Sequence, residues 1–349
     1  MGAEPTIALD AMGGDEAPDM VVDGAALSLE RCPDVRFLLY GDAARLRPLV
    51  DAKPALARCC DIRHTDDVVG SGDKPSIALR QGRQSSMSLA IKAVRDGEAA
   101  GVVSAGNTGA LMAIAKLALR TVPGISRPAI ASYLPTLRGE TVMLDLGANV
   151  DCDARNLVEF AIMGEVYARA VLGVQNPTIG LLNIGIEDVK GNDGVREAAA
   201  MLKDTRLPIR FHGFVEGDDI AAGTVDVVVT DGFSGNIALK TAEGTVKLFS
   251  GYLREAFRHS IPARIGYLFA RGALGRVRER LDPRHHNGAI LIGLNGIVIK
   301  SHGGTDALGF ANAVGVAIDM VNHRIIERIR EDLELIGFGK PETEPAAVT

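Results

Sequence analysis

The sequence of 349 residues contains no tryptophan, and aromatic residues make up only 4% of it. Large rings can therefore fill little of the interior. Glycine is abundant, with 40 residues, and 47% of the chain is hydrophobic. Small aliphatic side chains must form most of the core, which is typical of α/β proteins whose parallel sheet is buried on both faces.

Cysteine is scarce and unpatterned. The four cysteines, Cys32, Cys59, Cys60 and Cys152, show no CxxC spacing and no disulfide framework. No apolar run approaches the roughly 20 residues needed to cross a bilayer, and no secretory leader pattern precedes the first strand-like run at Thr6. We therefore expect a cytoplasmic protein with reduced thiols.

The motifs of several other protein classes are also missing. The net charge of −6 disfavours a nucleic-acid partner, and the seven histidines are too scattered to predict a metal site. Residues 11–15 follow the first predicted strand but lack the GxGxxG of dinucleotide-binding folds. Residues 232–235 lack the GxSxG of serine hydrolases. We expect neither a metal nor an organic cofactor.

What the chain does contain is a regular alternation of strand-length and helix-length apolar segments. The predicted strands are Thr6–Asp10, Arg36–Tyr40, Gly101–Ser104, Thr141–Leu146, Thr178–Ile184, Ile209–Phe214, Val225–Thr230, Ala289–Leu294 and Gly296–Lys300. The predicted helices include Asp19–Leu29, Thr108–Leu119, Ala154–Leu172, Val195–Leu202, Ile237–Tyr252 and one final helix from about Asp306 to Leu335. This alternation favours a doubly wound α/β fold with a mostly parallel sheet.

One segment departs from the pattern. Residues 254–280 carry seven arginines against two glutamates, with apolar residues between them, in an otherwise acidic protein. We predict a basic amphipathic helical segment. We expect a single α/β/α domain over residues 1–336, with 254–280 as an insertion, and a disordered tail over 337–349 that is rich in Pro and Glu.

Four predicted strands end in loops that contain glycine and asparagine and lead into a helix. These loops begin at Ala105, Gly147, Gly185 and Asp231. Glycine lets a backbone approach a ligand, and the N–H groups of a helix start attract anions. Open α/β sheets bind ligands beyond the carboxyl ends of their strands. We therefore expect the four loops to converge on one anion-binding crevice, although Gly-Asn pairs are also ordinary turn and cap residues.

Several single residues in or near these loops have two interpretations. Lys190 is suited to binding phosphate or a developing oxyanion, or is a solvated loop lysine. His302 can act as an acid or hydrogen-bond donor, or can cap the following helix. Asp145 and Asp231 lie at strand ends, where structural hydrogen bonding is the alternative. Cys152 is expected to be a packed thiol rather than a nucleophile.

Together these motifs give the chain a close resemblance to a known family over nearly its full length. The resemblance depends on residues 9–15, Lys74-Pro75, Ser85-Ser86-Met87, residues 104–110, residues 144–151, residues 231–236 and Ser301-His302-Gly303. In this order they are similar to the PlsX family of phosphate acyltransferases. The resemblance implies a Rossmann-like α/β/α sandwich, related to phosphate acetyltransferases, that forms a homodimer.

The resemblance also implies a reaction: acyl-ACP and inorganic phosphate give acyl-phosphate and free acyl carrier protein (ACP), for phospholipid synthesis. We expect Lys190, His302 and Asp231 to be catalytic. Phosphate and substrate are expected to be bound by Gly13, Gly14, Asp15, Ser86, Gly106, Asn107, Thr108, Asp145, Gly147, Asn149, Gly232, Gly235, Asn236 and Gly303. Direct attack of phosphate on the thioester, without an acyl-enzyme, is our mechanistic hypothesis.

The basic segment has three candidate partners: ACP, the inner membrane surface and a second copy of the chain. The residues expected to make the ACP or membrane contact are Arg254, Arg258, Arg264, Leu268, Phe269 and Arg271. The glycerol-3-phosphate acyltransferase that consumes acyl-phosphate is a further expected partner. Two other functions stay open: a non-catalytic anion-binding scaffold, and an oxidoreductase of the isocitrate dehydrogenase type.

Overall fold

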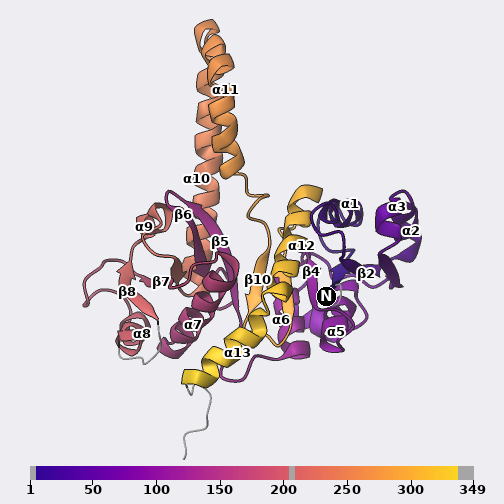
Figure 1. Cartoon of the computed structure of the whole chain (residues 1–349), viewed down its shortest axis with the longest axis horizontal. Helices are drawn as coiled ribbons and strands as arrows, with labels where there is room; N and C mark the ends of the chain where they lie inside the picture. The colour runs from indigo at the N-terminus through magenta and orange to yellow at the C-terminus, as the bar shows by residue number, and fades with distance from the viewer. Residues whose placement is uncertain (1–4, 204–208, 337–349) are drawn as a thin grey trace, which may run out of the picture.

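The structure, a computed structural model, describes residues 5–203 and 209–336 (Figure 1). The tail predicted over residues 337–349 lies outside the described residues. The strands are β1 (Thr6–Asp10), β2 (Arg36–Gly41), β3 (Cys60–His64), β4 (Gly101–Ser104), β5 (Ala129–Thr136), β6 (Gly139–Leu144), β7 (Thr178–Leu182), β8 (Arg210–Val215), β9 (Val227–Val229), β10 (Ala289–Ile292) and β11 (Ile297–Lys300). The helices are α1 (Asp19–Ser28), α2 (Ala43–Asp51), α3 (Pro54–Ala57), α4 (Pro75–Gln81), α5 (Ser86–Arg95), α6 (Thr108–Leu119), α7 (Ala154–Val171), α8 (Asp193–Lys203), α9 (Gly217–Ala222), α10 (Gly232–Arg258), α11 (Ile261–Arg280), α12 (Ala307–Asn322) and α13 (Ile325–Ile336).

All strands belong to one 11-stranded sheet in the order β3-β2-β1-β4-β11-β10-β5-β6-β9-β7-β8. The sheet is mostly parallel and covered by helices, so the predicted α/β/α fold is confirmed. Strand direction changes in the middle, because β10 is antiparallel to both β11 and β5, and β5 is antiparallel to β6. The parallel strands on one side of this junction therefore run opposite to those on the other side.

This reversal corrects one expectation. The carboxyl end of β4 lies at one edge of the sheet, whereas those of β6, β7 and β9 lie at the opposite edge. The four Gly/Asn loops therefore do not converge at a single edge, as we expected from a doubly wound sheet. The reason is the pair β5 and β10. The sequence analysis missed β5 altogether and did not predict that β10 runs antiparallel.

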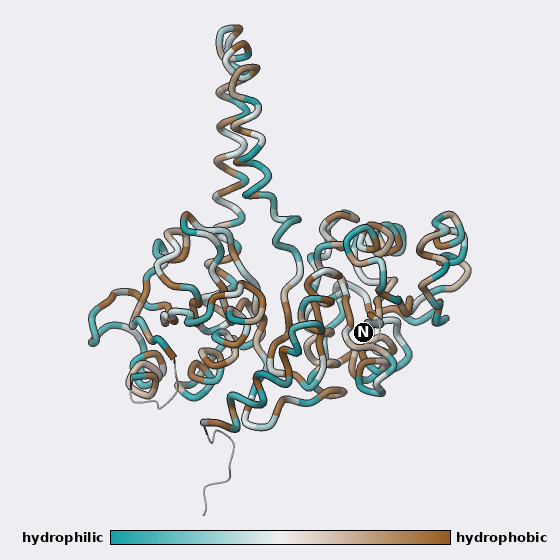
Figure 2. The backbone as a smooth tube through the Cα atoms, in the orientation of Figure 1, coloured by the Kyte–Doolittle hydropathy of each residue, from teal (hydrophilic) through white to brown (hydrophobic). Residues whose placement is uncertain are grey.

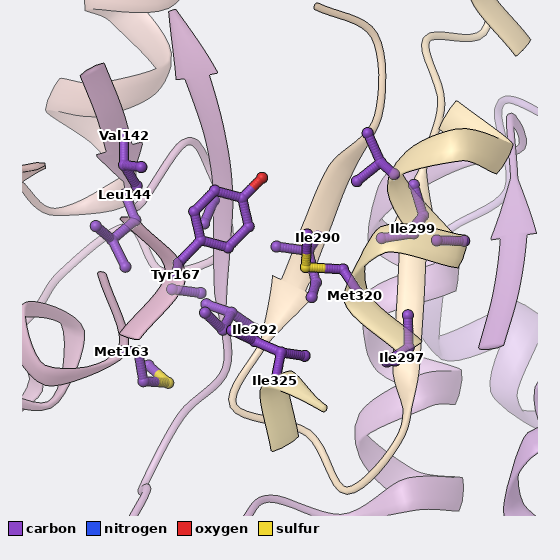
Figure 3. Close-up of a cluster of buried hydrophobic side chains, with 14 of the residues drawn as sticks. Val142, Leu144, Met163, Tyr167, Ile290, Ile292, Ile297, Ile299, Met320 and Ile325 are labelled. Carbon is purple, nitrogen blue, oxygen red and sulfur yellow. The ribbon is translucent and has the colours of Figure 1, made fainter. Parts of the chain in front are cut away.

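Alternate residues of each strand face two separate apolar layers. Ile7 and Leu9 of β1 belong to the layer covered by α1, α7, α12 and α13, and Ala8 belongs to the layer covered by α4, α5 and α6. This alternation is the period of two that a pleated strand imposes. Figure 3 shows the first layer at the junction, where Tyr167 of α7 lies near Ile290 and Ile292 of β10.

The basic segment is part of a helical hairpin that projects away from the sheet (Figure 1). The hairpin comprises most of α10 and all of α11. The only buried residues of these two helices are Gly232 and Gly235, at the start of α10. Ser260 separates the helices, and its hydroxyl oxygen accepts a hydrogen bond from the Ala263 N–H. Phe257 and Tyr267 pack edge to face, 5.4 Å between ring centroids, across the hairpin. Figure 2 shows that apolar and hydrophilic residues alternate along it.

Two other helix boundaries differ from the prediction. The helix expected to start at Ile237 begins at Gly232, because the Asp231 carboxylate caps it by accepting from the Ser234 N–H. The single final helix is divided into α12 and α13, since Arg324 adopts a positive φ of 51° that a continuous helix cannot contain. Among the described residues, no helix combines the length and apolarity needed to cross a membrane.

Candidate active site

The loops that follow β1, β4 and β11 form what we call the first loop group: residues 11–15, 105–107 and 301–304. The strands β1, β4 and β11 are adjacent and parallel, so these loops leave the same edge of the sheet. Asp15 N–H donates to the Gly303 carbonyl at 2.9 Å, which joins the first and third loops. The expected binding residues in or beside this group are Gly13, Gly14, Asp15, Ser86, Gly106, Asn107, Thr108 and Gly303, together with His302.

The first loop group is built around Asp10, the last residue of β1, which is 1% exposed. Its two carboxylate oxygens accept from the hydroxyls of Ser86 and Ser104, each at 2.6 Å. Burial raises the pKa of Asp10, and the two serine hydrogen bonds oppose that shift. A side chain at Gly13 would collide with this carboxylate, which explains the glycine. Ser86 is therefore engaged with Asp10, which the sequence analysis did not single out.

Lys300 is a second residue that the sequence analysis missed. It ends β11, and its Nζ donates to the carbonyl oxygens of Ser301 and, at 3.3 Å, Ala105. Burial lowers the pKa of Lys300 to about 8, although the carboxylates of Asp10 and Asp15 raise it. Its position at the end of a continuous apolar strand, two residues before His302, was the available signal.

His302 is held in one tautomer by its own loop. The Gly304 N–H donates to Nδ1 of His302 at 3.2 Å, so the ring proton lies on Nε2. Burial lowers the pKa of His302, and the ammonium of Lys240 lowers it further. The ring is therefore neutral at pH 7 and can donate a hydrogen bond from Nε2.

The other expected loop residues of this group have local roles. Asn107 caps α6 by accepting from the Ala110 N–H, and its amide donates to the carbonyls of Ser71 and Asp73. Thr108, the next residue, is exposed at the first turn of α6. The Gly-Asn loop therefore acts as a helix cap, which was one of its two interpretations. The N–H groups of the first turn of α6 lie at the same edge of the sheet.

The loops after β6, β7 and β9 form the second loop group: residues 145–151, 183–192 and 230–236. Its centre is Asp145, which is fully buried. One carboxylate oxygen accepts from the N–H groups of Ile130, Gly147 and Ala148, and the other accepts from the backbone and side-chain N–H groups of Asn149. Five donors satisfy this carboxylate, so structural hydrogen bonding accounts for it.

The start of α10 lies directly against this loop. The Gly232 N–H donates to the Asn149 carbonyl at 2.7 Å. A side chain at Gly235 would collide with the Asp145 carbonyl. Gly147 lies beside Asn236 and adopts a positive φ of 134°, which residues with a side chain rarely adopt. Both positions therefore require glycine. The structure therefore brings together Asp145, Gly147, Asn149, Asp231, Gly232, Gly235 and Asn236.

A polar pocket of about 270 Å³ opens in the second loop group. It is lined by Val150, Asp151, Cys152, Asn192, Asp231, Phe233 and Ser234. The first residues of α7, α8 and α10 are capped around it by Asp153, Asn192 and Asp231. Burial, together with the carboxylates of Asp145 and Asp231, raises the pKa of Cys152 to about 12. This thiol is therefore protonated at neutral pH and a poor nucleophile.

Lys190 lies in the β7–α8 loop of the same group and is exposed. Its backbone is held by the Asn183 amide, which donates to the carbonyls of Gly185 and Lys190. The loop continues to Asn192, which lines the polar pocket. Lys190 therefore gives the second loop group a cation that solvent can reach.

Helix α10 connects the two loop groups. Asn236 contacts the second group at Gly147, and Lys240, one turn later, lowers the pKa values of both His302 and Lys300 in the first group. One helical turn advances about 5.4 Å, so a single face of α10 adjoins both groups. Asn107 is not brought to the second loop group in this way, because its side-chain hydrogen bonds are to Ser71, Asp73 and Ala110.

One group of potential metal ligands occurs in the described part of the chain. Asp42, His64 and Asp66 place their ligand atoms within 4.8 Å of one another. They lie at the ends of β2 and β3, at the outer edge of the sheet, and belong to neither loop group. Nδ1 of His64 already accepts from the Ala43 N–H.

Solved structures share this fold at low sequence identity. A phosphotransacetylase from Streptococcus pyogenes superimposes with a TM-score of 0.59 and 18% identity, over 94% of this chain and 95% of the other. The EutD phosphotransacetylase from Staphylococcus aureus gives 0.56 and 17%, over 93% and 95%. At these identities the likeness concerns the fold.

Sequence relatives are much more similar. A phosphate acyltransferase from Paramagnetospirillum magneticum is 64% identical over 334 residues, which cover 96% of this chain and 95% of the relative. One from Rhodospirillum rubrum is 64% identical over 327 residues, covering 94% of each. The family model described as fatty acid synthesis protein matches residues 5–328. The chain belongs to this fatty acid synthesis protein family, the PlsX family of phosphate acyltransferases.

Proposed function

We propose that this phosphate acyltransferase takes its acyl group from the thioester of acyl carrier protein and releases acyl-phosphate for phospholipid synthesis. The observation that carries the proposal is the 64% identity, over nearly the whole chain, to proteins named phosphate acyltransferase. Two loop groups rich in glycine and helix N-termini, connected by α10, support a site that binds an inorganic anion beside an extended substrate.

In the proposed reaction a phosphate oxygen attacks the thioester carbonyl. A P–O–C bond forms as the C–S bond breaks, and the electron pair leaves with the sulfur of the carrier. Phosphate is already nucleophilic and the thioester is already activated. The protein therefore contributes mainly by holding both reactants in line, which can lower a barrier by roughly 7–11 kcal/mol.

Three residues are proposed to act on the reacting groups. Lys190 supplies positive charge to phosphate or to the tetrahedral oxyanion. His302 donates a hydrogen bond from Nε2 to the leaving thiolate, which takes its proton from solvent; the tautomer set by Gly304 supports this role. Asp231 orders the first turn of α10, whose residues Phe233 and Ser234 line the polar pocket. The glycines and asparagines of both loop groups are proposed to bind substrate through backbone and amide groups.

We propose direct transfer, without a covalent acyl-enzyme. Cys152 is the thiol nearest to the second loop group, and its pKa of about 12 keeps it protonated. The test is to mix the protein with radiolabelled acyl-ACP in the absence of phosphate, and to isolate the protein under denaturing conditions. Protein-bound label that disappears in a Cys152→Ala variant would contradict direct transfer.

The activity itself is tested by following free carrier thiol and acyl-phosphate together. Acyl-phosphate is trapped by hydroxylamine as a hydroxamate. Both products should appear in equal amounts and only when phosphate is present. Thiol release that does not depend on phosphate would identify a thioesterase, and no release at all would favour a non-catalytic scaffold. A change in absorbance at 340 nm with NAD would instead indicate the oxidoreductase alternative.

We propose that the helical hairpin contacts the inner membrane surface, where acyl-phosphate is consumed. It carries exposed apolar side chains, among them Leu268 at 60% and Phe269 at 88% exposure. Arg254, Arg258, Arg264 and Arg271 on the same two helices match an anionic surface. Leu268→Asp/Phe269→Asp should abolish flotation with anionic liposomes, while the control Leu117→Asp, on an exposed site of α6, should not. Unchanged flotation would remove the membrane contact and leave ACP or a second copy of the chain as the partner.

We further propose that residues 1–336 act as one catalytic domain, with the hairpin as an insertion, and that the chain works as a homodimer. The continuous 11-stranded sheet supports a single domain. Sedimentation equilibrium should give twice the chain mass of 36.8 kDa. Co-purification with the glycerol-3-phosphate acyltransferase, lost in the Leu268→Asp/Phe269→Asp variant, would support handover of product at the membrane.

A further inference from the structure

Three polar side chains form a row across the carboxyl ends of neighbouring strands; Asp10 and Ser104 are buried and Lys300 is half-buried. Ser104 of β4 pairs in register with Lys300 of β11 on one side. On the other side its hydroxyl donates to Asp10 of β1. Asp10 and Ser104 are 1% and 0% exposed. The three strands therefore place a carboxylate, a hydroxyl and an ammonium in sequence underneath the first loop group.

The ammonium of Lys300 connects the loop after β4 with the loop after β11. Its Nζ donates to the carbonyl of Ala105, at the start of the loop that carries Asn107, and to that of Ser301, next to His302. An ammonium has several donors on a single atom and can bind both carbonyls at once. Lys300 thus adds a side-chain link between the two loops, above the backbone hydrogen bond from the Ser301 N–H to the Ser104 carbonyl at 2.9 Å that already joins their bases.

Packing alone does not explain a lysine at this position. Burying an ammonium costs free energy that a methionine of similar shape does not cost. The carboxylates of Asp10 and Asp15 offset part of that cost, whereas Lys240 of α10 adds to it. The structure therefore keeps a charge at a half-buried position where packing does not require one.

We propose that Lys300 is a positioning residue for acyl transfer, which holds the loop of His302 at a fixed distance from the loop of Asn107, with Asp10 as its counter-charge. This inference rests on the function proposed above, in which His302 acts on the leaving group. It assigns Lys300 no contact with substrate. Loss of the cation lets the His302 loop move while leaving the second loop group and Lys190 in place.

The kinetic test compares Lys300→Met and Lys300→Ala with the control Lys116→Met, which removes an exposed lysine of α6. A misplaced catalytic group can cost about 100-fold in rate, so we expect kcat to fall about 100-fold in both Lys300 variants. KM for phosphate should stay within about threefold, because Lys190 is unaffected. Ethylammonium should restore part of the kcat of Lys300→Ala and none of the small loss in the control. A folded Lys300→Met variant with normal kcat would overturn the proposal, as would a defect that ethylammonium does not relieve.

Two measurements without substrate separate this inference from the proposed function. Hydrogen exchange of residues 105–107 and 301–304 should be faster in Lys300→Met than in wild type, and unchanged in Lys116→Met. The NMR titration midpoint of His302 should rise in Lys300→Met, because the Lys300 charge lowers it, while Lys240, Lys247 and Glu243 continue to act. Unchanged exchange and midpoint would overturn the positioning role. If wild type makes no acyl-phosphate but both changes occur, the proposed function fails and the positioning of this loop stands.

Lys300→Arg covers the case in which the Met and Ala variants do not fold. It keeps the cation with a bulkier head group. It should retain a higher kcat and slower loop exchange than any folded neutral variant, including Lys300→Gln. Equal values for Lys300→Arg and Lys300→Gln would overturn the proposal.

Discussion

The two loop groups organise similar sequences by different means. In the first, side chains from β1, β4 and α5 bond to one another around Asp10, and Lys300 of β11 joins the loops through their carbonyls. In the second, a single carboxylate, Asp145, accepts five hydrogen bonds, and four of them come from backbone N–H groups. The comparison teaches that a strand end followed by Gly and Asn specifies a close turn, but not what holds that turn.

The largest effect is expected from removing the centre of the second group. Asp145→Ala leaves four backbone donors and one amide without their acceptor in a buried place. Buried unpaired donors are costly, so the free energy of unfolding should fall by about 3–5 kcal/mol. Urea denaturation measures it, with Asp151→Ala, an exposed neighbour, as control. A loss below about 1 kcal/mol would mean that water replaces the carboxylate.

Lys190→Met should separate catalysis from stability in the same group. Since Lys190 is exposed, the free energy of unfolding should change by less than about 0.5 kcal/mol. Loss of a charge that stabilises the transition state should lower kcat/KM by about 100- to 1,000-fold. Lys116→Met, which removes an exposed lysine of α6, is the control. Normal turnover by Lys190→Met would remove Lys190 from the mechanism.

In the first group, His302 should produce a pH dependence. Burial and Lys240 lower its pKa below the usual 6.5, so the neutral ring is present above that value and is lost as pH falls through it. We expect kcat/KM to decline on the acid side with a midpoint below 6.5. His302→Gln should lower kcat about 100-fold and abolish this limb. Lys247→Met should move the limb to higher pH, and an unmoved limb would assign it to another group.

The smallest effect should come from Asp10→Asn, the counterpart of the Asp145 variant. The amide keeps one acceptor for Ser86 or Ser104 and removes the cost of burying a charge, whereas the lost attraction to Lys300 acts in the opposite direction; we therefore expect a net change of about 1 kcal/mol or less. Because burial raises the pKa of Asp10 above 3.8 in the folded state, the wild-type carboxylate loses stability as pH rises from about 4 through its folded pKa. Asp10→Asn should lack that part of the pH dependence in urea titrations at pH 4 and pH 7. A loss as large as that of Asp145→Ala would make the two groups alike.

Much of the fold could be predicted from local pattern. The buried strands β1, β2, β4 and β7 follow continuous apolar runs, and the strand-helix alternation implied the layered sheet. Edge strand β3 was missed because its sequence, CDIRH, is largely polar and exposed. Strand β5 was missed since Ser132 and Pro135 interrupt its apolar run. The antiparallel direction of β5 and β10 depends on contacts between distant segments, so no local pattern reveals it.

The candidate site shows the same division. Glycines at Gly13, Gly232 and Gly235 were found as strand-end residues, and the structure explains each by a close approach. Asp10 and Lys300 were not found, because their importance arises from partners 76 to 195 positions away in the chain. Periodicity and motifs report only on neighbours in sequence.

The sequence by itself determined the class of fold, the strand ends that carry polar residues, and the family, because these depend on local order and composition. Only the tertiary structure decided that the strand ends form two groups at opposite edges, that α10 adjoins both, and that Lys300 joins two loops of one group. The physical reason is that strand direction, helix placement and buried charge pairs are set by the packing of segments far apart in the chain.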